Sequence, residues 1–559
     1  MFYDIFVYNF LKDNVLLLFI YLFIIFVNFP LESVALPRVY GILFDKIKLF
    51  KNEKIENVYE NLMSMNFSGS MIAIFAIWTI IIITYGIKHH LESILVPGYM
   101  NYIRKELYEH TINAFKENYT DVKAGEYLSR MLELMRNAKD LFQYSLGGFI
   151  PLMVSMLFSI LYLSYNDKNI AMVLISSLTL VSIICYFGGN YLIDKVGKRE
   201  NYMNEVVNQG IQNSLDNLMN IYINNESDND INANKGVEDK GRELMEHIMV
   251  VQNGVITTCN TVAVAAYFGS LLILYKYLRN GKLSSAKIIA YILILGNILS
   301  DAFNLSSGYI HNVIYKLGII DSAKPFMKTI FIDKSERTLK SDIQNGDIEF
   351  KDVVFRYNKE SEEVLFDGLN LKLTGKTKIG VMGRSGSGKT TLMKMLIGLY
   401  KPEEGHIMID GIDISKMNIE HLRDNINYVN QRTQLFDETI LYNMKYGNDI
   451  TEEEITSKLK AYKLDAVFSD LPGGVNASAG LGGGNLSGGM QKITILMRGL
   501  LKKGNIVILD EPLAGLDKTS ISKVIDMIVS EMKGKTLIVI THDNTILPYM
   551  DRVVDINNI

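Results

Sequence analysis

Two patterns of hydrophobic and polar positions divide the chain into two halves. In the first half, apolar runs recur that are long enough for a helix to cross a bilayer, which takes roughly 20 residues. Six runs are predicted to be membrane spans: about 14–30, 69–87, 147–165, 169–188, 254–277 and 286–308. The alternative is that these runs are buried helices of a large soluble core. From about residue 345, short β-branched runs alternate with glycines and helical stretches, which is typical of an α/β domain.

The segments between the predicted spans alternate between long and short. Those at about 88–146 and 189–253 are long, polar and patterned as helices, whereas the connections at 166–168 and 278–285 are short. We therefore expect the long segments to extend the spans beyond one face of the membrane. Basic residues are frequent in the first long segment, which favours the cytosolic side, although the loop at 31–68 also holds several lysines.

The composition fits a membrane protein and narrows the chemistry. Of the 559 residues, 48% are hydrophobic, and the formal net charge of −4 gives no sign of nucleic-acid binding. The two cysteines, Cys185 and Cys259, both lie in apolar runs and are too few for a disulfide framework or a zinc site. No cluster of Cys or His residues falls in the predicted spans, which argues against metal export. The N-terminus lacks the basic region and cleavage site of a secretory signal.

A phosphate-binding loop is predicted at residues 383–391. An apolar strand leads into GRSGSGKTT and then into a helical pattern, which is the context that the G-x-x-x-x-G-K-T motif requires. The glycines let backbone N–H groups wrap phosphates at the N-terminus of the helix. We expect Lys389 to reach the β- and γ-phosphates of ATP and Thr390 to bind Mg²⁺. The predicted ATP contacts of the loop are Gly383, Arg384, Ser385, Gly386, Ser387, Gly388, Lys389, Thr390 and Thr391.

Two later strands end in candidate catalytic groups. NIVILDEP at 505–512 is apolar until two acids, of which Asp510 is expected to hold Mg²⁺ and Glu511 to act as general base or to orient water. The alternative for Glu511 is a helix N-cap. IVITHD at 538–543 ends near His542, which is placed to contact the γ-phosphate because ligands meet the carboxyl ends of strands in doubly wound sheets. The predicted catalytic residues are Lys389, Glu511 and His542.

The order and spacing of these elements resemble the nucleotide-binding domain of an ABC transporter. FKDVVFRY at 350–357 resembles the strand before the phosphate loop, which implies that Tyr357 stacks on adenine. NYVNQRTQLFDETI at 427–440 resembles the Q-loop, which implies that Gln431 contacts Mg²⁺ and water. LSGG at 486–489 is similar to the family signature, AGLD at 514–517 to the D-loop, and His542 to the switch histidine.

The membrane half resembles the exporter type of the same family. Residues 1–325 are predicted to form an all-α domain with six spans, 326–344 a linker, and 345–559 an α/β P-loop NTPase domain of the ABC type. Six spans with one nucleotide-binding domain make a half-transporter, which implies a dimer. The resemblance also implies that Ser487, Gly488 and Gly489 of one subunit close on the γ-phosphate at Lys389 of the other. All catalytic positions are present, which favours a homodimer, and a heterodimer with a degenerate partner stays open.

Further resemblance concerns coupling between the two halves. HTINAFKENYTDVKAGEYLSRM at 110–131 resembles the first cytosolic loop of this exporter type. Coupling helices are expected near 113–122 and 211–223, docked in the cleft beside Gln431.

The chain departs from the family pattern at four positions. Met490 replaces the glutamine that usually follows LSGG, and Ile493 replaces a basic residue. Leu481 stands where a glutamate is expected, which puts in doubt the usual contact of this loop with the coupling helices. Asn430 replaces a common proline before Gln431.

The predicted function is an ATP-driven exporter of an unidentified substrate, with ATP and Mg²⁺ as cofactors and the N-terminus and nucleotide-binding domain in the cytosol. The alternatives are an ATP-gated channel or a membrane-embedded regulator, and a soluble ABC ATPase. Asp301 in the last span is either a functional intramembrane acid or a residue near a helix end at the inner interface. The spans are otherwise aromatic and aliphatic, with Asn260 and Asn297 as scattered polar groups, and they suit a lipid, an amphipathic drug, a peptide or a thiol conjugate.

Overall fold

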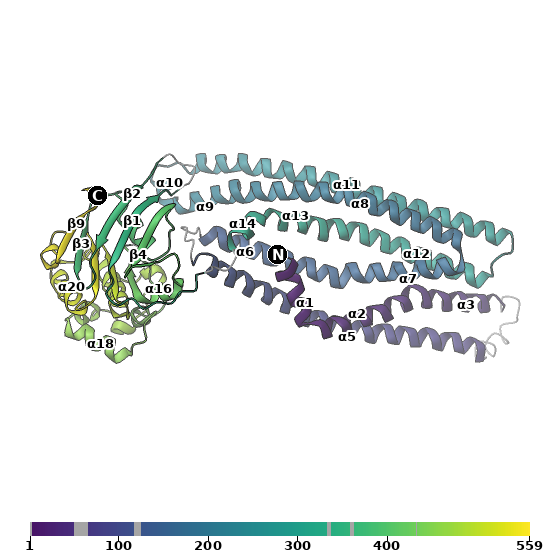
Figure 1. Cartoon of the computed structure of the whole chain (residues 1–559). Helices are drawn as coiled ribbons and strands as arrows, with labels where there is room; N and C mark the ends of the chain where they lie inside the picture. The colour runs from purple at the N-terminus through teal and green to yellow at the C-terminus, as the bar shows by residue number, and fades with distance from the viewer. Residues whose placement is uncertain are drawn as a thin grey trace. The chain divides into compact units, whose positions relative to one another are not determined.

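The computed structural model describes residues 3–49, 65–116, 124–331, 337–357, 363–431 and 433–558, which form two compact units (Figure 1). Residues 1–111 and 122–331 belong to the helical unit, and residues 112–121 and 332–559 belong to the α/β unit. The predicted fold class, an all-α membrane domain joined to an α/β domain, is confirmed.

The helical unit is built from long helices, several of which are joined by single π-helical turns. The helices are α1 Asn9–Asp13, α2 Val15–Pro30, α3 Leu36–Leu49, α5 Met65–Ala114, α6 Ala124–Tyr144, α7 Ile150–Asn166, α8 Lys168–Tyr202, α9 Gln209–Asp216, α10 Leu218–Ile223, α11 Ser227–Arg279, α12 Ser285–Gly308, α13 Tyr315–Ser322 and α14 Lys324–Ile330. The π-helical turns η1 Tyr3–Tyr8, η2 Leu31–Ala35, η4 Ser145–Phe149, η5 Met203–Asn208 and η6 Tyr309–Ile314 continue or connect them.

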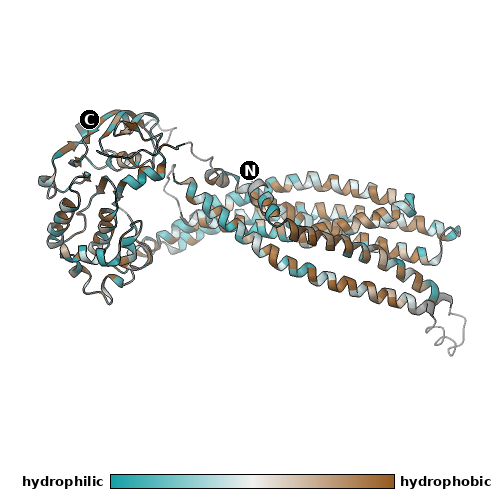
Figure 2. Cartoon of the chain, turned by 60° about the horizontal axis from the view of Figure 1, so that its bottom comes forward, coloured by the Kyte–Doolittle hydropathy of each residue, from teal (hydrophilic) through white to brown (hydrophobic). Residues whose placement is uncertain are grey.

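Six helical segments of the described chain are long and apolar enough to cross a membrane. They are Val15–Ile47, Gly69–Ala114, Tyr127–Asn166, Lys168–Asp216, Ser227–Arg279 and Ser285–Ser322. Each coincides with one predicted span and extends it, so the six spans are confirmed. Hydrophobic residues are concentrated in the apolar part of these segments, whereas their extensions are more hydrophilic (Figure 2).

The long polar segments of the sequence continue the spans as helices, as predicted. Helices α8 and α11 lie side by side over much of their length (Figure 1). Leu192 and Val196 of α8, Ile248 of α11, and Ile310 and Ile314 of η6 are buried together beyond the apolar runs. This packing holds the helical extensions together where no lipid covers them.

Asp301 lies inside a continuous helical run. Helix α12 continues through η6 into α13, and the run extends from Ser285 to Ser322. The Asp301 carboxylate accepts a hydrogen bond of 2.6 Å from the Ser155 hydroxyl of α7. Asp301 is therefore not at a helix end and is paired with a neighbouring helix, while its depth relative to the inner interface stays a prediction.

The α/β unit contains two sheets. Strands β1 Ile348–Phe355, β2 Phe366–Leu373, β4 Glu404–Ile409 and β5 Ile412–Asp413 form an antiparallel sheet in the order β2-β1-β4-β5. Strands β3 Lys378–Met382, β6 Ile426–Val429, β7 Ile506–Asp510, β8 Thr536–Ile540 and β9 Arg552–Asp555 form a parallel sheet in the order β6-β7-β8-β3-β9. The helices are α15 Lys389–Leu396, α16 Ile419–Asn425, α17 Ile440–Lys445, α18 Glu452–Ala461, α19 Gly488–Leu501 and α20 Lys518–Glu531.

The parallel sheet brings the predicted catalytic segments together at one edge. Every residue of β7 and β8 is buried, as expected for strands covered on both faces. Asp510 pairs with Ile540, and Val381 also pairs with Ile540, so the carboxyl ends of β3, β7 and β8 lie next to one another. This is the edge at which parallel sheets bind ligands.

The second predicted coupling segment, 211–223, forms α9 and α10. Four large apolar side chains of α10 are exposed: Leu218 (38%), Met219 (74%), Tyr222 (67%) and Ile223 (69%). The first predicted coupling segment, 113–122, lies mostly outside the described residues. Its residue Lys116 forms an ion pair with Glu420 of α16 within the α/β unit. Docking beside Gln431 stays a prediction.

Candidate nucleotide site

The phosphate loop joins β3 to α15, in the strand–loop–helix order that the motif requires. Gly386 (φ +83°) and Gly388 (φ +86°) adopt left-handed backbone conformations that favour glycine. At Gly388, a Cβ atom would lie 2.5 Å from the ring of Phe366, so a side chain has no space there. The loop can therefore present its backbone N–H groups at the N-terminus of α15, where the helix dipole favours an anion.

Lys389 lies at the start of α15 and folds back over the loop. Its ammonium donates hydrogen bonds of 2.8 Å to the carbonyls of both Gly383 and Arg384. Burial lowers the pKa of Lys389, and the nearby acids Glu511, Asp510 and Asp555 oppose this shift. A cation is thus held among backbone dipoles at the end of the sheet, in reach of a phosphate chain bound by the loop.

Two groups predicted to bind Mg²⁺ are in direct contact. The Thr390 hydroxyl donates a hydrogen bond of 2.8 Å to Asp510 Oδ2, which joins α15 to the end of β7. Asp510 is 2% exposed. Burial raises its pKa, while the Thr390 hydrogen bond and the positive charges of Lys492 and Lys389 lower it. A buried carboxylate beside a hydroxyl supplies the hard oxygen donors that Mg²⁺ prefers, so these residues fit the ion.

The phosphate loop also contains a buried polar atom that fits a phosphate. Ser387 Oγ is buried and has no hydrogen-bond partner in the described part of the chain. Buried hydroxyls normally form a hydrogen bond, because a buried polar group without a partner costs free energy. A phosphate oxygen in the loop would satisfy this hydroxyl.

Glu511 and His542 meet across the ends of β7 and β8. Glu511 Oε1 accepts a hydrogen bond of 3.1 Å from the backbone N–H of His542, and Oε2 accepts one of 3.4 Å from Thr541 Oγ1. His542 Nε2 lies 3.9 Å from the same carboxylate. Glu511 has a positive φ of 49°, which is uncommon outside glycine and is typical of functional sites. The alternative N-cap role for Glu511 is wrong, because a turn follows it and Asp517 caps α20.

Tyr357 lies beside the start of α15. Its ring packs edge-on against Phe355 and Tyr400, with centroid distances of 5.3 and 5.9 Å. Its hydroxyl contacts the hydroxyl of Thr391, so this predicted ATP-binding threonine is held by the tyrosine. Tyr357 is 67% exposed, which leaves ring surface available for stacking.

Gln431 follows β6 and is exposed. Strand β6 pairs with β7, with Val429 opposite Leu509, so the end of β6 adjoins the strand end that holds Asp510. Gln431 is therefore at the same edge of the sheet as the predicted metal ligands. Stacking of Tyr357 and the role of Gln431 stay predictions.

The signature segment forms the start of α19. Ser487 is the N-cap of this helix, and its hydroxyl accepts a hydrogen bond of 3.3 Å from the backbone N–H of Met490. A Cβ atom at Gly488 would contact nothing within 4 Å, so the N-terminus of α19 faces open space. Within the described residues, no hydrogen bond joins Ser487 to the phosphate loop of its own chain.

Gln491 fixes the glycine-rich loop in front of this helix. Its amide donates hydrogen bonds to the carbonyls of Gly483 (2.9 Å) and Leu486 (3.2 Å). Leu481 lies at the tip of the loop and is 85% exposed. The loop therefore presents an apolar side chain where the family pattern places an acid.

Two further residues face the predicted metal ligand, and sequence reasoning missed both. Lys492 of α19 is 7% exposed. Burial lowers its pKa, and the charges of Asp510 and Glu511 oppose this shift. Tyr428 of β6 forms a side-chain hydrogen bond with Asp510. Lys492 could have been noticed in the sequence, because it is a charged residue within the apolar face of a predicted helix. Tyr428 could not, because a tyrosine in an apolar strand is ordinary.

The structure shows the surroundings of three residues that depart from the family pattern, Met490, Ile493 and Asn430. Ile493 is fully buried in a hydrophobic core that α19 forms with α17, α18, α20 and the parallel sheet, and Met490 packs against the same core. An apolar side chain satisfies both positions, because this face of α19 packs against other helices. Asn430 Oδ1 accepts a hydrogen bond of 3.4 Å from the Tyr428 hydroxyl.

The similarities to known proteins cover both units. The ABC transporter family matches residues 366–514. A putative export ATP-binding/permease protein of Rickettsia bellii is 28% identical over 474 residues, which are 81% of this chain and 79% of that protein. ABC transporter B family member 3 of Dictyostelium discoideum is 37% identical over 221 residues, 39% of this chain and 15% of that protein. The fold is similar to that of a bacterial Atm1-family ABC exporter with ATP bound, with a TM-score of 0.80, 17% identity and coverage of 98% of this chain and 93% of that chain.

Proposed function

We propose that this chain is an ABC half-transporter of the exporter type, and that two copies of it bind ATP between their α/β units and thereby drive transport. It is a multi-pass membrane protein that couples ATP hydrolysis to export. Half-transporters of this kind generally dimerise. The catalytic machinery is present in this chain, which supports a homodimer.

The observation that carries the proposal is the presence of two phosphate-directed elements in one chain. The loop at 383–391 forms a complete cradle, with Lys389 folded over it. The signature helix α19 offers a second anion-binding N-terminus, with open space at Gly488. Because Ser487 makes no hydrogen bond to its own loop in the described chain, we assign it to the nucleotide held by the other copy.

In the proposed hydrolysis step, catalysis depends on positioning and on neutralising charge. Lys389 and the backbone of the loop hold the β- and γ-phosphates, while Ser487 and the N–H groups of Gly488 and Gly489 from the opposite copy close over the γ-phosphate. Mg²⁺, held by Thr390 and Asp510 with Gln431 nearby, would neutralise charge on the phosphates. Glu511 accepts a proton from the attacking water, and its contact with the backbone of His542 fixes the carboxylate in place.

Coupling to the membrane is assigned to the tips of the helical extensions. The exposed apolar side chains of α10 offer a surface that an α/β unit could bury. The ion pair between Lys116 and Glu420 supports the same role for the first loop. We assign the N-terminus and the α/β unit to the cytosol, because ATP is supplied there and the first long segment is rich in basic residues.

An ATP-gated channel or a regulator is the weaker alternative. The relative from Rickettsia bellii, which matches over most of its length, is named an export ATP-binding/permease protein. A soluble ATPase is excluded by the six apolar helical segments of the described chain.

The test is the distance between the two α/β units in the full-length protein in lipid nanodiscs. A spin label at Leu481→Cys, in a chain whose Cys185 and Cys259 are replaced by serine, reports this distance by pulsed electron resonance. In the Glu511→Gln background, ATP with Mg²⁺ should shift the distances between the two labels to shorter values. A Lys389→Ala chain is the control and should show no shift. Identical distance distributions with and without ATP would refute the proposal.

A further inference from the structure

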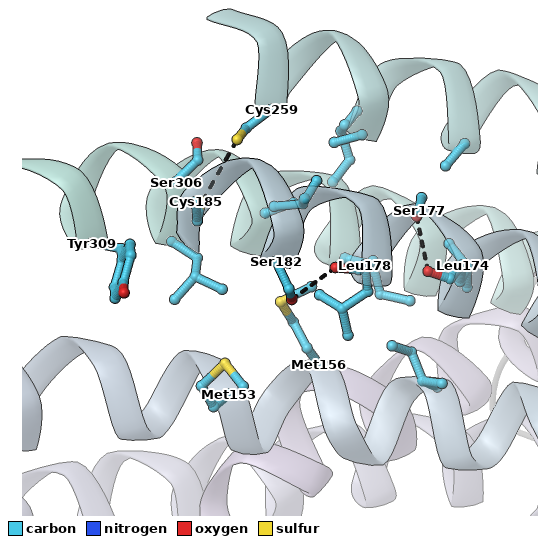
Figure 3. Close-up of a pocket in the computed structure, with 18 of the residues that line it drawn as sticks. Met153, Met156, Leu174, Ser177, Leu178, Ser182, Cys185, Cys259, Ser306 and Tyr309 are labelled. Atoms are coloured by element: carbon cyan, nitrogen blue, oxygen red, sulfur yellow. Dashed lines mark hydrogen bonds between the residues drawn. The ribbon is translucent and has the colours of Figure 1, made fainter. Parts of the chain in front are cut away.

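A cavity of about 350 Å³ lies within the helical unit, at the depth of the predicted spans. It is lined by α7, α8, α11 and α12, with the turns η4 and η6 at one end (Figure 3). Met153 and Tyr186 at its rim are 40% and 64% exposed, so the cavity opens at the surface of the unit. Its size falls within the range of about 300–1,000 Å³ that is typical of small-molecule sites.

None of the described residues that line this cavity carries a charge. Its serine hydroxyls are already paired. Ser177 and Ser182 each donate to a backbone carbonyl of α8 (Figure 3). Ser306 donates to Asn260 Oδ1. The rest of the lining is mostly apolar, with residues such as Met156, Ile160 and Leu295. A charged ligand would lose its hydration here without gaining a partner, which is very costly in an apolar surrounding.

The polar end of the cavity lies near Tyr309, Ser306 and the two cysteines (Figure 3). The Tyr309 hydroxyl makes no hydrogen bond within the described residues of the chain. It is therefore a donor and acceptor available to one uncharged polar group of a ligand. Cys185 and Cys259 are the only cysteines of the chain, and their sulfur atoms are 3.7 Å apart.

A second cavity in the helical unit is a poorer match for a ligand that crosses the membrane. Its lining includes the charged residues Glu92, Asp140 and Lys316. These charges are already compensated, because Lys316 pairs with Asp140 at 2.9 Å and Glu92 pairs with Lys88 at 2.9 Å. These residues also lie outside the predicted spans, in the helical extensions.

We propose that the cavity between α7, α8, α11 and α12 binds the transported molecule, and that this molecule is neutral and largely apolar with a single uncharged polar group. That the bound molecule is also transported rests on the proposed function. Binding in the cavity does not depend on it. Access through the exposed rim at the depth of the spans suits a molecule that enters from the lipid.

The two cysteines provide a direct test, because alkylation of this chain reports on the cavity alone. In lipid nanodiscs, N-ethylmaleimide should modify the more accessible Cys185, measured by the mass of the intact chain. The neutral probe N-phenyl-1-naphthylamine should slow this alkylation at least five-fold. Its sulfonated analogue 8-anilino-1-naphthalenesulfonate has nearly the same ring system with a negative charge, and it should slow alkylation less than two-fold. Equal protection by the two probes would overturn the proposal.

Variants separate the cavity from the lipid around it. Ala263→Phe on α11 fills the cavity, so that N-phenyl-1-naphthylamine gives no further protection, and Ala302→Leu on α12 serves as a milder second variant should the first fail to fold. Ala265→Phe, at an exposed position of the same helix, is the matched control and should behave like the unaltered chain. Ala265→Cys, in a chain whose Cys185 and Cys259 are replaced by serine, provides a single thiol outside the cavity that should not be protected. Equal protection of this introduced thiol, or full protection in both filled variants, would overturn the proposal.

The last arm links binding to transport. N-phenyl-1-naphthylamine should raise the ATPase rate at least two-fold in the unaltered chain and in Ala265→Phe, and it should leave Ala263→Phe and Ala302→Leu unstimulated. Protection of Cys185 in a chain without ATPase activity would refute the proposed function and uphold the binding site. ATPase activity that depends on Glu511, without any protection of Cys185, would refute the cavity proposal and leave the proposed function intact.

Discussion

In the α/β unit, charged side chains converge on one edge of the parallel sheet, whereas in the helical unit two polar pairs join neighbouring helices within the predicted spans. Lys389 follows β3, Asp510 and Glu511 stand together at the end of β7, and the two segments meet where the strands end. Asp301 is instead bound to Ser155, and Ser306 to Asn260. The first arrangement leaves several charged groups available for a phosphate, whereas the cavity of the helical unit offers a ligand a mostly apolar surface and the hydroxyl of Tyr309.

This difference predicts how the two units respond to substitution. In the α/β unit, removal of a single charged group should strongly lower the rate of ATP hydrolysis, because each group has a separate role. In the helical unit, a change in side-chain volume should matter more than a change of one polar group. The following predictions test this comparison, from the largest expected effect to the smallest.

Glu511→Gln should have the largest effect. Removing a general base typically costs about 10²- to 10⁴-fold in rate, so the ATPase rate should fall by at least about 100-fold. ATP binding should be unchanged, since the amide keeps the size of the side chain and can still accept the hydrogen bond from His542. Steady-state ATPase assays and equilibrium binding of ATP measure the two quantities. Glu453→Gln, at an exposed position of α18, is the control, and unchanged turnover of Glu511→Gln would contradict the assignment.

Asp410→Ala should destabilise the α/β unit. The Asp410 carboxylate accepts hydrogen bonds from the backbone N–H groups of Gln344 (2.8 Å), Asn345 (3.0 Å) and Asp347 (2.8 Å). Burial would raise its pKa, but these N–H groups prevail and hold the pKa below its usual value. Loss of hydrogen bonds to a charged group should reduce the free energy of unfolding by roughly 2 kcal/mol at pH 7.

The pH dependence of this effect follows from the sign of the shift. Because the pKa is lower in the folded state, the stabilisation is fully present above the unfolded value of about 3.9 and is lost as the pH falls towards the folded value. Hydrogen exchange of β1 amides, corrected for intrinsic rates, should show a deficit in Asp410→Ala at pH 7 that shrinks below about pH 4. The protection of β1 amides in Asp410→Asn should lie between that of the unaltered chain and that of Asp410→Ala. A deficit in Asp410→Ala that does not change with pH would contradict the role of the charge.

Ser155→Ala should affect the helical unit moderately and the chemistry little. It leaves the Asp301 carboxyl without its hydrogen-bond donor, which costs roughly 1–3 kcal/mol of stability in a buried site. The basal ATPase rate should stay within about three-fold, a change of less than 1 kcal/mol in the barrier. Thermal unfolding followed by the fluorescence of Trp78, the single tryptophan, measures the stability. Ser176→Ala, on the exposed face of α8, is the control. A loss of ATPase activity comparable to that of Glu511→Gln would remove the distinction between the units.

Lys116→Ala should have the smallest effect. The Lys116 side chain is 35% exposed and that of Glu420 is 63% exposed, and solvent screening makes exposed ion pairs weak. Hydrogen exchange at α16 should rise by less than about five-fold, and less still at high salt. The double exchange Lys116→Glu with Glu420→Lys should restore the protection that either single reversal lowers. A ten-fold rise would show that this contact is more than an exposed pair.

The sequence was most informative where function depends on local pattern. Apolar runs located all six spans, because a helix that crosses a bilayer needs a long uninterrupted stretch. The phosphate loop and the acids after β7 could be recognised because their spacing along the chain fixes their chemistry. Glu511 and His542 were both expected at the carboxyl ends of strands, and the structure places these two strand ends side by side.

The sequence could not show contacts that depend on how helices cross. Cys185 and Cys259 lie 3.7 Å apart on α8 and α11, yet their positions in the sequence gave no reason to pair them. Lys492 looked like an ordinary helix residue until α19 was placed against β7. The sequence also did not show that the helix carrying Asp301 continues through the π-helical turn η6 where the apolar run stops.

The central claim, that each ATP site is built from two copies, is tested most directly by placing the same two substitutions in different chains. Dimers that combine a Lys389→Ala chain with a Ser487→Ala chain should retain one complete site and about half of the hydrolytic rate, by the half-site arrangement. Dimers that combine a chain carrying both substitutions with an unaltered chain should have no complete site and almost no activity. The reverse result, with activity only when one chain is left unaltered, would show that each chain works alone and would contradict the account.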